Sequence, residues 1–284
     1  MAQVHPQAVV DPKAELADDV AVGPFCYIGP RVRIGSGCRL ISHVAIFGPT
    51  VLGEHNTLWP QVVLGGDPQD LKYRGEPSEL IIGDRNELRE GVTVHRGTLC
   101  GGGVTRIGSD NLFMSGMHVA HDCHIGSHIV IANSTQLAGH VRVHDHAAVG
   151  GMTGIHHFVT VGSYSYVGGM SRIVHDVPPF MIVEGHPCRV RGVNVVGLQR
   201  RRFAEATIDL LKDACRDLFR GPAGDHEPHT VGNMSQALQR WRHNHAEEPS
   251  VAMLLDFLAN SSIGVFGRHQ EAFRTDHRFS NPVR

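Results

Sequence analysis

The chain has no long apolar segment. Within its 284 residues, no stretch approaches the 18 consecutive apolar residues of a membrane-spanning helix. The start, Met-Ala-Gln-Val-His-Pro, has neither a basic nor an apolar leader region, so we expect no signal peptide. The 26 Lys and Arg nearly balance the 28 Asp and Glu, which argues against nucleic-acid binding as the main task. These absences predict a cytoplasmic protein without a transmembrane segment.

Paired cysteines and aromatic residues are also scarce. None of the six Cys forms a CxxC pair, so no disulfide framework is indicated. Aromatic residues make up 6%, against 33 Gly and 15 Pro, which favours many short strands and turns over a helical bundle. Histidine, by contrast, is abundant: with 21 His, mild acidification changes the charge of the chain considerably.

Aliphatic residues recur every six positions along most of the first 173 residues. The first uninterrupted run is Val22, Ile28, Ile34, Leu40, Ile46, Leu52, Leu58 and Leu64. The register resumes at Ile82 and runs again from Ile107 to Ile173. A period of six fits neither an α-helix nor a long amphipathic strand. It predicts a parallel β-helix of hexapeptide repeats, in which three hexads form an 18-residue coil and the coils stack to bury a core.

The composition changes once the hexads end. Apolar residues at three-to-five spacing over 203–218 predict an amphipathic helix, with further helices over 235–243 and 251–258 and a linker at 221–230. We therefore predict two domains, a β-helix catalytic domain at residues 1–193 and a helical domain at residues 194–284.

Two breaks interrupt the repeat, at residues 66–79 and 96–104. Repeat proteins commonly carry function in such insertions. The first break is polar and charged, and the second contains three consecutive glycines. We expect the first segment to project from the column, and the glycines of the second to allow close backbone approach or flexibility.

A histidine-rich patch lies near the middle of the repeat. Residues 18 apart are neighbours in adjacent coils, so His121 is expected beside Gly139, and Asp122 beside His140. An imidazole next to a carboxylate suits a general base, and a glycine N–H nearby suits an oxyanion. Two other interpretations remain open here. One is a metal site that uses His118, His121 and His140, as in zinc-dependent hydratases of this fold, and the other is a polar ladder without chemistry.

Longer segments carry more specific patterns. They include Gln69-Asp70-Leu71-Lys72-Tyr73-Arg74-Gly75-Glu76-Pro77, Val92-Thr93-Val94-His95-Arg96-Gly97-Thr98, His118-Val119-Ala120-His121-Asp122-Cys123 and Leu137-Ala138-Gly139-His140-Val141. Together they resemble the UDP-N-acetylglucosamine 3-O-acyltransferases that begin lipid A synthesis, over residues 5–220. The resemblance implies a mainly β fold, a left-handed parallel β-helix of hexapeptide repeats with a C-terminal α-helical domain. No counterpart is recognised for the tail after about Arg268.

The resemblance also implies an activity. Such enzymes transfer a 3-hydroxyacyl group from acyl carrier protein to the 3-hydroxyl of UDP-N-acetylglucosamine, with no metal and no organic cofactor. By position, His121 is the general base, Asp122 orients it, and Gly139 supplies the oxyanion N–H. Sugar-nucleotide contacts fall on Asp70, Lys72, His118, His140, His156, Asn194 and Arg201. In a homotrimer with sites between subunits, Asp70 and Lys72 come from the neighbouring subunit.

Two further roles follow from the same resemblance and from charge. Gly169 occupies the position that limits acyl length, and its missing side chain favours longer donors. A basic strip at Arg200 and Arg202 is expected to receive the acidic carrier protein by electrostatic steering. Some nucleotide-end positions depart from the family pattern: His157, Pro187 and Val196.

Two other functions remain as alternatives to this activity. One is an N-acyltransferase that acts on a UDP-amino sugar, and the other is a metal-dependent β-helix hydratase.

Overall fold

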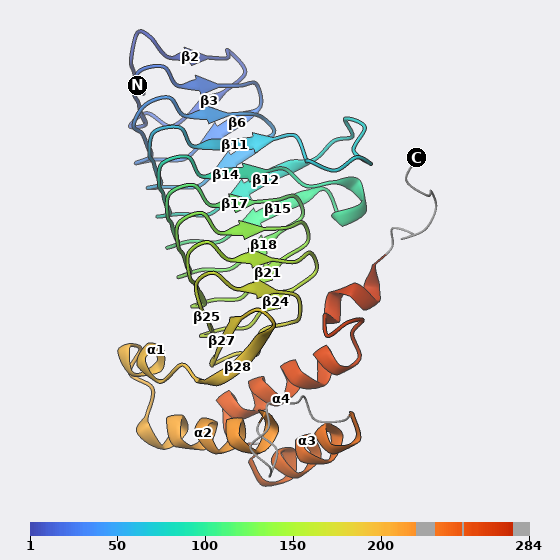
Figure 1. Cartoon of the computed structure of the whole chain (residues 1–284). Coiled ribbons are helices and arrows are strands. Elements are labelled where there is room, and N and C mark those ends of the chain that lie inside the picture. Colours follow the sequence, from blue (N-terminus) through green and yellow to red (C-terminus); the bar gives the residue numbers. More distant parts are fainter. Residues whose placement is uncertain (220–230, 246, 275–284) are drawn as a thin grey trace.

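The chain forms a left-handed parallel β-helix that carries helices at its C-terminal end (Figure 1). The structure is a computed structural model, and it describes residues 1–219, 231–245 and 247–274. Short parallel strands stack into three sheets, which form the three faces of the column. Each coil passes through the three faces in turn, as the period of six predicts.

Each face is one sheet. The first face consists of β1 (Gln3–Val4), β4 (Ala21–Val22), β7 (Arg39–Leu40), β10 (Thr57–Leu58), β13 (Glu87–Leu88), β16 (Leu112–Phe113), β19 (Val130–Ile131), β22 (Ala148–Val149), β25 (Tyr166–Val167), β27 (Met181–Gly185) and β28 (Cys188–Val193). The second consists of β2 (Val9–Val10), β5 (Tyr27–Ile28), β8 (Ala45–Ile46), β11 (Val63–Gly66), β14 (Thr93–His95), β17 (His118–Val119), β20 (Gln136–Leu137), β23 (Gly154–Ile155) and β26 (Arg172–Ile173). The third consists of β3 (Glu15–Leu16), β6 (Val32–Ile34), β9 (Thr50–Leu52), β12 (Glu79–Ile82), β15 (Val104–Ile107), β18 (His124–Ile125), β21 (Arg142–Val143) and β24 (Thr160–Val161).

The register between neighbouring coils follows the 18-residue rule. Val119 pairs with Leu137, which in turn pairs with Ile155. Across the first insertion, Leu52 pairs with Ile82, 30 positions on, and across the second, Ile82 pairs with Ile107, 25 positions on. The extra residues leave the column as two excursions between strands, so both predicted insertions are confirmed (Figure 1).

The core of the column is the stack of inward-facing aliphatic side chains. Ile46, Leu64 and Val119, from three different coils of the second face, are completely buried. Each coil shares its apolar side chains with the coils above and below, because one coil alone is too small to exclude water. The stack holds the outward-facing residues of successive coils in fixed positions.

The column ends in a reversal of the chain followed by helices. Strand β27 still pairs in parallel with β25, but β28 returns antiparallel to β27. The helices that follow are α1 (Val195–Arg200), α2 (Glu205–Phe219), α3 (Val231–His245) and α4 (Pro249–Ser262). They share a second apolar core with Phe180 and Met181. The linker expected at 221–230 lies outside the described residues, and the division at residue 193 stays a prediction.

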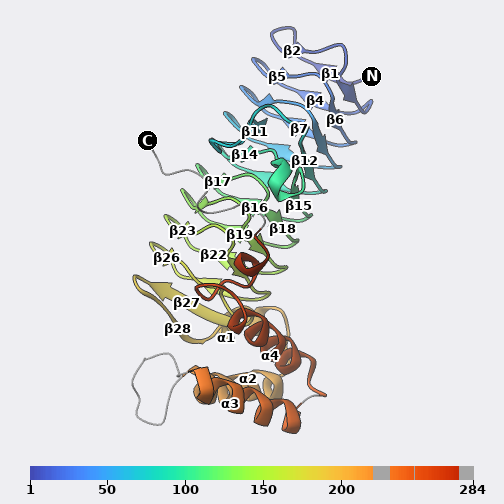
Figure 2. The ribbon, with the colours of Figure 1, turned by 90° about the vertical axis from the view of Figure 1, so that its right-hand side faces the viewer.

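After α4 the chain returns to the side of the column. A short 3-10 helix, η2 (His269–Phe273), lies beside the third face, on the side where the second insertion carries another 3-10 helix, η1 (Leu99–Gly101) (Figure 2). Gln270 donates a side-chain hydrogen bond to Thr160 in β24, at 3.2 Å. In the described part of the chain, no helix is long and apolar enough to cross a membrane.

Candidate active site

His121 and Asp122 occupy the corner of one coil, between β17 on the second face and β18 on the third. Asp122 has a left-handed backbone conformation, with φ of 60°, which turns the chain at this point. The Nδ1 atom of His121 lies 2.7 Å from Oδ2 of Asp122. Because an ionised carboxylate only accepts hydrogen bonds, Nδ1 carries the proton and Nε2 is left with a lone pair. This tautomer is the one that a general base requires.

The carboxylate of Asp122 is held by the second insertion. Its side chain is completely buried, and it accepts hydrogen bonds from the backbone N–H and the hydroxyl of Thr98, both at 2.7 Å. The hydroxyl of Thr105 in turn accepts the backbone N–H of Asp122. Burial by itself raises the pKa of Asp122, but the hydrogen bonds from His121 and Thr98 outweigh it and hold the pKa below its usual value. Asp122 is therefore a fixed negative charge.

Gly139 lies against the imidazole of His121 in the next coil. A Cβ atom on Gly139 would come within 2.5 Å of Cε1 and 2.8 Å of Nε2 of His121, so only glycine fits here. Among the described residues, the backbone N–H of Gly139 has no hydrogen-bond acceptor. This N–H is thus available to an external oxygen beside the basic nitrogen of His121.

His140 completes the corner from the other side. Its Nε2 lies 3.7 Å from Oδ2 of Asp122, and its ring meets that of His121 edge-on at 5.2 Å. Phe158 stacks on His140 with ring centroids 4.4 Å apart. The expected neighbours, Asp122 with His140 and His121 with Gly139, are therefore together.

A groove of about 590 Å³ runs over the second face beside this corner. His118, His121, Gly139 and His156 line it, as does Gln69 from the first insertion of the same chain. Nδ1 of His156 lies 3.1 Å from the backbone oxygen of His157. The groove gathers four of the sequence-predicted site residues. It also includes Gln69, which belongs to a quoted segment but was assigned no role from the sequence.

His118 is held in its neutral form. Its Nδ1 lies 2.7 Å from the hydroxyl oxygen of Thr93, and its ring meets His95 edge-on. Burial, followed by the nearby rings of His95 and His121, lowers the pKa of His118 to about 4. At neutral pH His118 therefore offers a hydrogen-bonding ring without charge.

Two of the sequence-predicted residues lie at a different corner. Asn194 caps α1 by accepting the N–H of Gly197, and it donates to the backbone oxygen of Tyr164 at 2.9 Å. Nη1 of Arg201 lies 2.7 Å from Nδ1 of His146. These contacts are at the turn between the third and first faces, so within one chain neither residue joins the His121 corner.

The remaining sequence-predicted residues are on loops and turns. Lys72 pairs with Asp70 within the first insertion, at 3.7 Å. Gly169 is exposed in the turn that precedes β26, the last strand of the grooved face. Arg200 and Arg202 are exposed at the end of α1.

The metal interpretation from the sequence used His118, His121 and His140. Among the described residues a different set comes together, since the ligand-type atoms of His121, Asp122 and His140 lie within 4.8 Å of one another. Two ligands of one tetrahedral zinc ion are about 3.3 Å apart, from typical bond lengths of 2.0–2.2 Å. His121 and Asp122 are closer than that, at 2.7 Å, which is a hydrogen-bond distance. The distance therefore favours a hydrogen bond from Nδ1 of His121 to Asp122 over two ligands of one metal ion.

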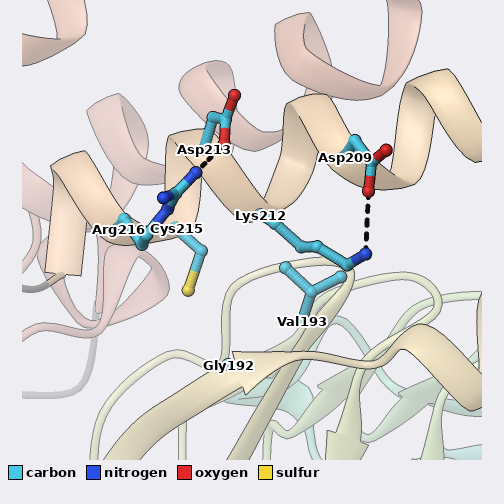
Figure 3. A pocket seen from close by; sticks show the side chains of 7 residues that line it. All are labelled: Gly192, Val193, Asp209, Lys212, Asp213, Cys215 and Arg216. Carbon is cyan, nitrogen blue, oxygen red and sulfur yellow. Dashed lines mark hydrogen bonds and ion pairs between the residues drawn. The ribbon is translucent and has the colours of Figure 1, made fainter.

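A second hollow, of about 650 Å³, lies between α2 and β28 (Figure 3). Its charged side chains pair with one another along α2, Lys212 with Asp209 and Arg216 with Asp213. They thereby neutralise each other at an exposed helix surface. We place no chemistry there.

Comparisons with known proteins find relatives that match nearly the whole chain. Residues 176–266 match the family described as Udp N-acetylglucosamine O-acyltransferase, domain 2. An acyl-[acyl-carrier-protein]–UDP-N-acetylglucosamine O-acyltransferase of Thermodesulfovibrio yellowstonii is 42% identical over 265 residues, 93% of this chain and 99% of that protein. The crystal structure of UDP-N-acetylglucosamine O-acyltransferase from Moraxella catarrhalis is 38% identical, with a TM-score of 0.83 over 89% of this chain and 95% of that one. The acyltransferase structure from Bacteroides fragilis is 34% identical, with a TM-score of 0.85 over 91% and 97%.

Proposed function

This chain belongs to the acyl-[acyl-carrier-protein]–UDP-N-acetylglucosamine O-acyltransferase family, and from that premise we propose how its His121 corner performs the reaction. The protein is an acyltransferase of lipid A biosynthesis and catalyses its first step. In our proposal, a 3-hydroxyacyl group passes from the thioester of acyl carrier protein to the 3-hydroxyl of UDP-N-acetylglucosamine.

The observation that carries this proposal is the hydrogen-bonded pair of His121 and Asp122 beside Gly139. Nε2 of His121 takes the proton of the sugar hydroxyl while its oxygen attacks the thioester carbonyl. The N–H of Gly139 donates to the oxyanion that forms on the carbonyl oxygen. The intermediate then collapses, the C–S bond breaks, and the imidazolium returns its proton to the leaving sulfur. Asp122 stabilises that imidazolium without taking a proton itself.

His118 and His156 are suited to orienting the sugar because they line the groove next to the base. A neutral His118 offers a hydrogen bond to a hydroxyl without attracting competing anions. These contacts hold the 3-hydroxyl close to Nε2. The translational and rotational entropy of the sugar is then lost on binding and not in the chemical step.

We further propose that the enzyme acts as a homotrimer with sites between subunits. Asn194 and Arg201 lie at a different corner of the column from His121. If these residues contact the nucleotide, a single chain cannot supply both ends of the site, and a second subunit has to supply one of them. Carrier docking at Arg200 and Arg202 and the cytoplasmic location stay predictions.

Product analysis tests the activity and its two alternatives together. Wild-type protein is incubated with UDP-N-acetylglucosamine and a series of 3-hydroxyacyl carrier-protein thioesters, and the products are identified by mass spectrometry. We expect an ester that mild alkali cleaves, and no product from the 3-deoxy sugar analogue. An alkali-stable amide formed only from the 3-amino analogue would favour the N-acyltransferase. Turnover that a chelator abolishes and zinc restores would favour metal chemistry.

A further inference from the structure

Three basic residues stand in one column on the outer side of the third face. Strand pairing places Arg106 opposite His124, and His124 opposite Arg142. Adjacent strands are about 4.8 Å apart, and like charges directly opposite each other destabilise a sheet. Within the described residues neither Arg106 nor Arg142 forms an ion pair. Partial burial lowers the pKa of His124, and the two arginines lower it further. The column thus gathers two guanidinium groups around His124, and the nearby carboxylate of Asp122 offsets their positive charge only in part.

The C-terminal segment closes a pocket over this column. The pocket has a volume of about 390 Å³. Its walls include His124 and Arg142 from the third face, Asp122, His140 and Phe158 from the catalytic corner, and Arg274 from the tail. The family match ends at residue 266, so the tail wall lies beyond it.

The tail wall is firmly attached. Asp176 accepts the backbone N–H of His269 at 2.8 Å, and Arg268 donates to the backbone oxygen of Val174 at 2.7 Å. Buried Glu271 pairs with Arg268 at 2.7 Å and also with Arg274, at 3.4 Å. Glu271 thus contacts two guanidinium groups, and the segment places that of Arg274 in the wall of the pocket.

Arg274 is connected to the catalytic corner by stacked rings. Its guanidinium lies 5.2 Å from the ring centroid of Phe158, which stacks on His140. His140 in turn lies beside Asp122. The tail therefore brings a cation to the third-face side of the corner, opposite the groove that contains His118 and His156.

The two sides of the corner suit the two halves of a thioester. A carbonyl at Gly139 carries an acyl chain on one side and sulfur on the other. If the acyl chain runs over the second face toward the turn of Gly169, the sulfur and its carrier arm extend toward the third face. Acyl carrier proteins present their acyl groups on a phosphopantetheine arm, which is joined to the protein through a phosphodiester with one negative charge. In free 4′-phosphopantetheine the phosphate is a monoester.

We propose that Arg142 and Arg274 hold the phosphate of the donor's phosphopantetheine arm in the pocket between the third face and the C-terminal segment. This inference rests on the proposed function and adds a donor subsite to it. Guanidinium groups suit a phosphoryl ligand because they give directed, charge-assisted hydrogen bonds. The tail is then a substrate-contacting part of the enzyme.

The test compares two small donors that differ only in the phosphate. Acyl-pantetheine and acyl-4′-phosphopantetheine, with the same acyl group, are each assayed with saturating UDP-N-acetylglucosamine. For the wild-type enzyme we expect kcat/KM to be about tenfold or more higher with the phosphorylated donor, as ionic hydrogen bonds to phosphate imply. In Arg142→Ala and Arg274→Ala this preference should fall several-fold, and in the double variant it should approach one. The preference of the wild type should also weaken as salt is raised.

Arg33→Ala is the matched control. Arg33 points outward from the same face, three strands before Arg106, and lies outside the pocket. It should keep the wild-type preference and the wild-type turnover. Titration of 4′-phosphopantetheine by calorimetry gives a readout that does not need turnover, and thermal melts verify that each variant is folded.

The outcomes distinguish a failure of the proposed donor subsite from a failure of the proposed acyltransferase activity. If the enzyme turns over both donors but the phosphate makes no difference, or Arg142→Ala and Arg274→Ala leave the preference unchanged, the donor subsite is wrong and the proposed function stands. A rise in KM for UDP-N-acetylglucosamine alone would reassign the pocket to the acceptor. A loss of subunit association in the variants would reassign the charges to an interface. If no form acylates the sugar nucleotide from any thioester, the proposed function itself fails.

Discussion

Replacing Asp122 with asparagine changes one atom of the corner and should abolish most activity. Oδ1 of Asp122 accepts a hydrogen bond from the backbone N–H of Thr98. Because a backbone N–H can only donate, the asparagine side chain has to keep its oxygen at this position. The new amide NH₂ then takes the place of Oδ2 and faces Nδ1 of His121. Nδ1 is forced to accept, so the ring proton moves to Nε2, the atom that has to take the proton of the sugar.

The expected loss is about 10²–10⁴-fold in kcat, the range found when general acid–base catalysis is removed. KM for the sugar nucleotide should change little, because Asp122 is completely buried and does not reach the groove. The free energy of unfolding should fall by about 1–3 kcal/mol, from the weakened charged hydrogen bonds to Thr98 and His121. The aliphatic stack is untouched, so the variant should remain folded.

The assay is steady-state acyl transfer, with the product quantified by mass spectrometry and folding followed by urea titration. Asp145→Asn is the matched control, since Asp145 is an exposed turn aspartate that accepts the N–H of Ser127 far from the dyad. It should retain nearly all activity. A folded Asp122→Asn enzyme with kcat within threefold of the wild type would refute the tautomer argument.

Three further changes test other parts of the site. Gly139→Ala places a Cβ 2.5 Å from Cε1 of His121, so kcat should fall about 10²-fold, as displaced catalytic groups imply, while circular dichroism stays unchanged; full activity would contradict the close approach. The pKa of His118 is lowered to about 4 in the folded chain. As the pH falls below about 6.5, His118 is therefore protonated in the unfolded chain before it is protonated in the folded chain. The free energy of unfolding should therefore be greatest above pH 6.5 and drop by roughly 2–3 kcal/mol toward pH 4, a drop that urea titration should find smaller in His118→Gln. Gly169→Met should shift selectivity toward shorter acyl donors in competition assays, and equal losses on long and short donors would make Gly169 structural.

The repeat made the column predictable in detail. Because every sixth residue faces inward, the pairing of Val119 with Leu137 follows from counting, and so does the approach of His121 to Gly139. Both breaks in the period mark insertions that the structure has between β11 and β12 and between β14 and β15. A period fixes neighbours within the column because the stacking distance is constant.

The contacts of residues in the insertions and in the tail could not be predicted by counting along the repeat. Thr98 belongs to an insertion, so counting by 18 gives no partner for it, and its double hydrogen bond to Asp122 depends on the path of that loop. Gln69 joins the groove for the same reason. The return of the tail to Thr160 and Phe158 depends on how the helices pack, which no local pattern in the tail reveals.

The most direct test of the central claim is the turnover of His121→Ala. The imidazole contacts Asp122 and Gly139 at the surface of the corner and not the aliphatic stack, so the variant should fold and assemble as the wild type does. Acyl transfer from 3-hydroxyacyl carrier protein to UDP-N-acetylglucosamine is measured on protein whose thermal melt and molar mass match the wild type. We predict that kcat falls by about 10²–10⁴-fold. Near-normal turnover in that folded variant would contradict the assignment of His121 as the general base.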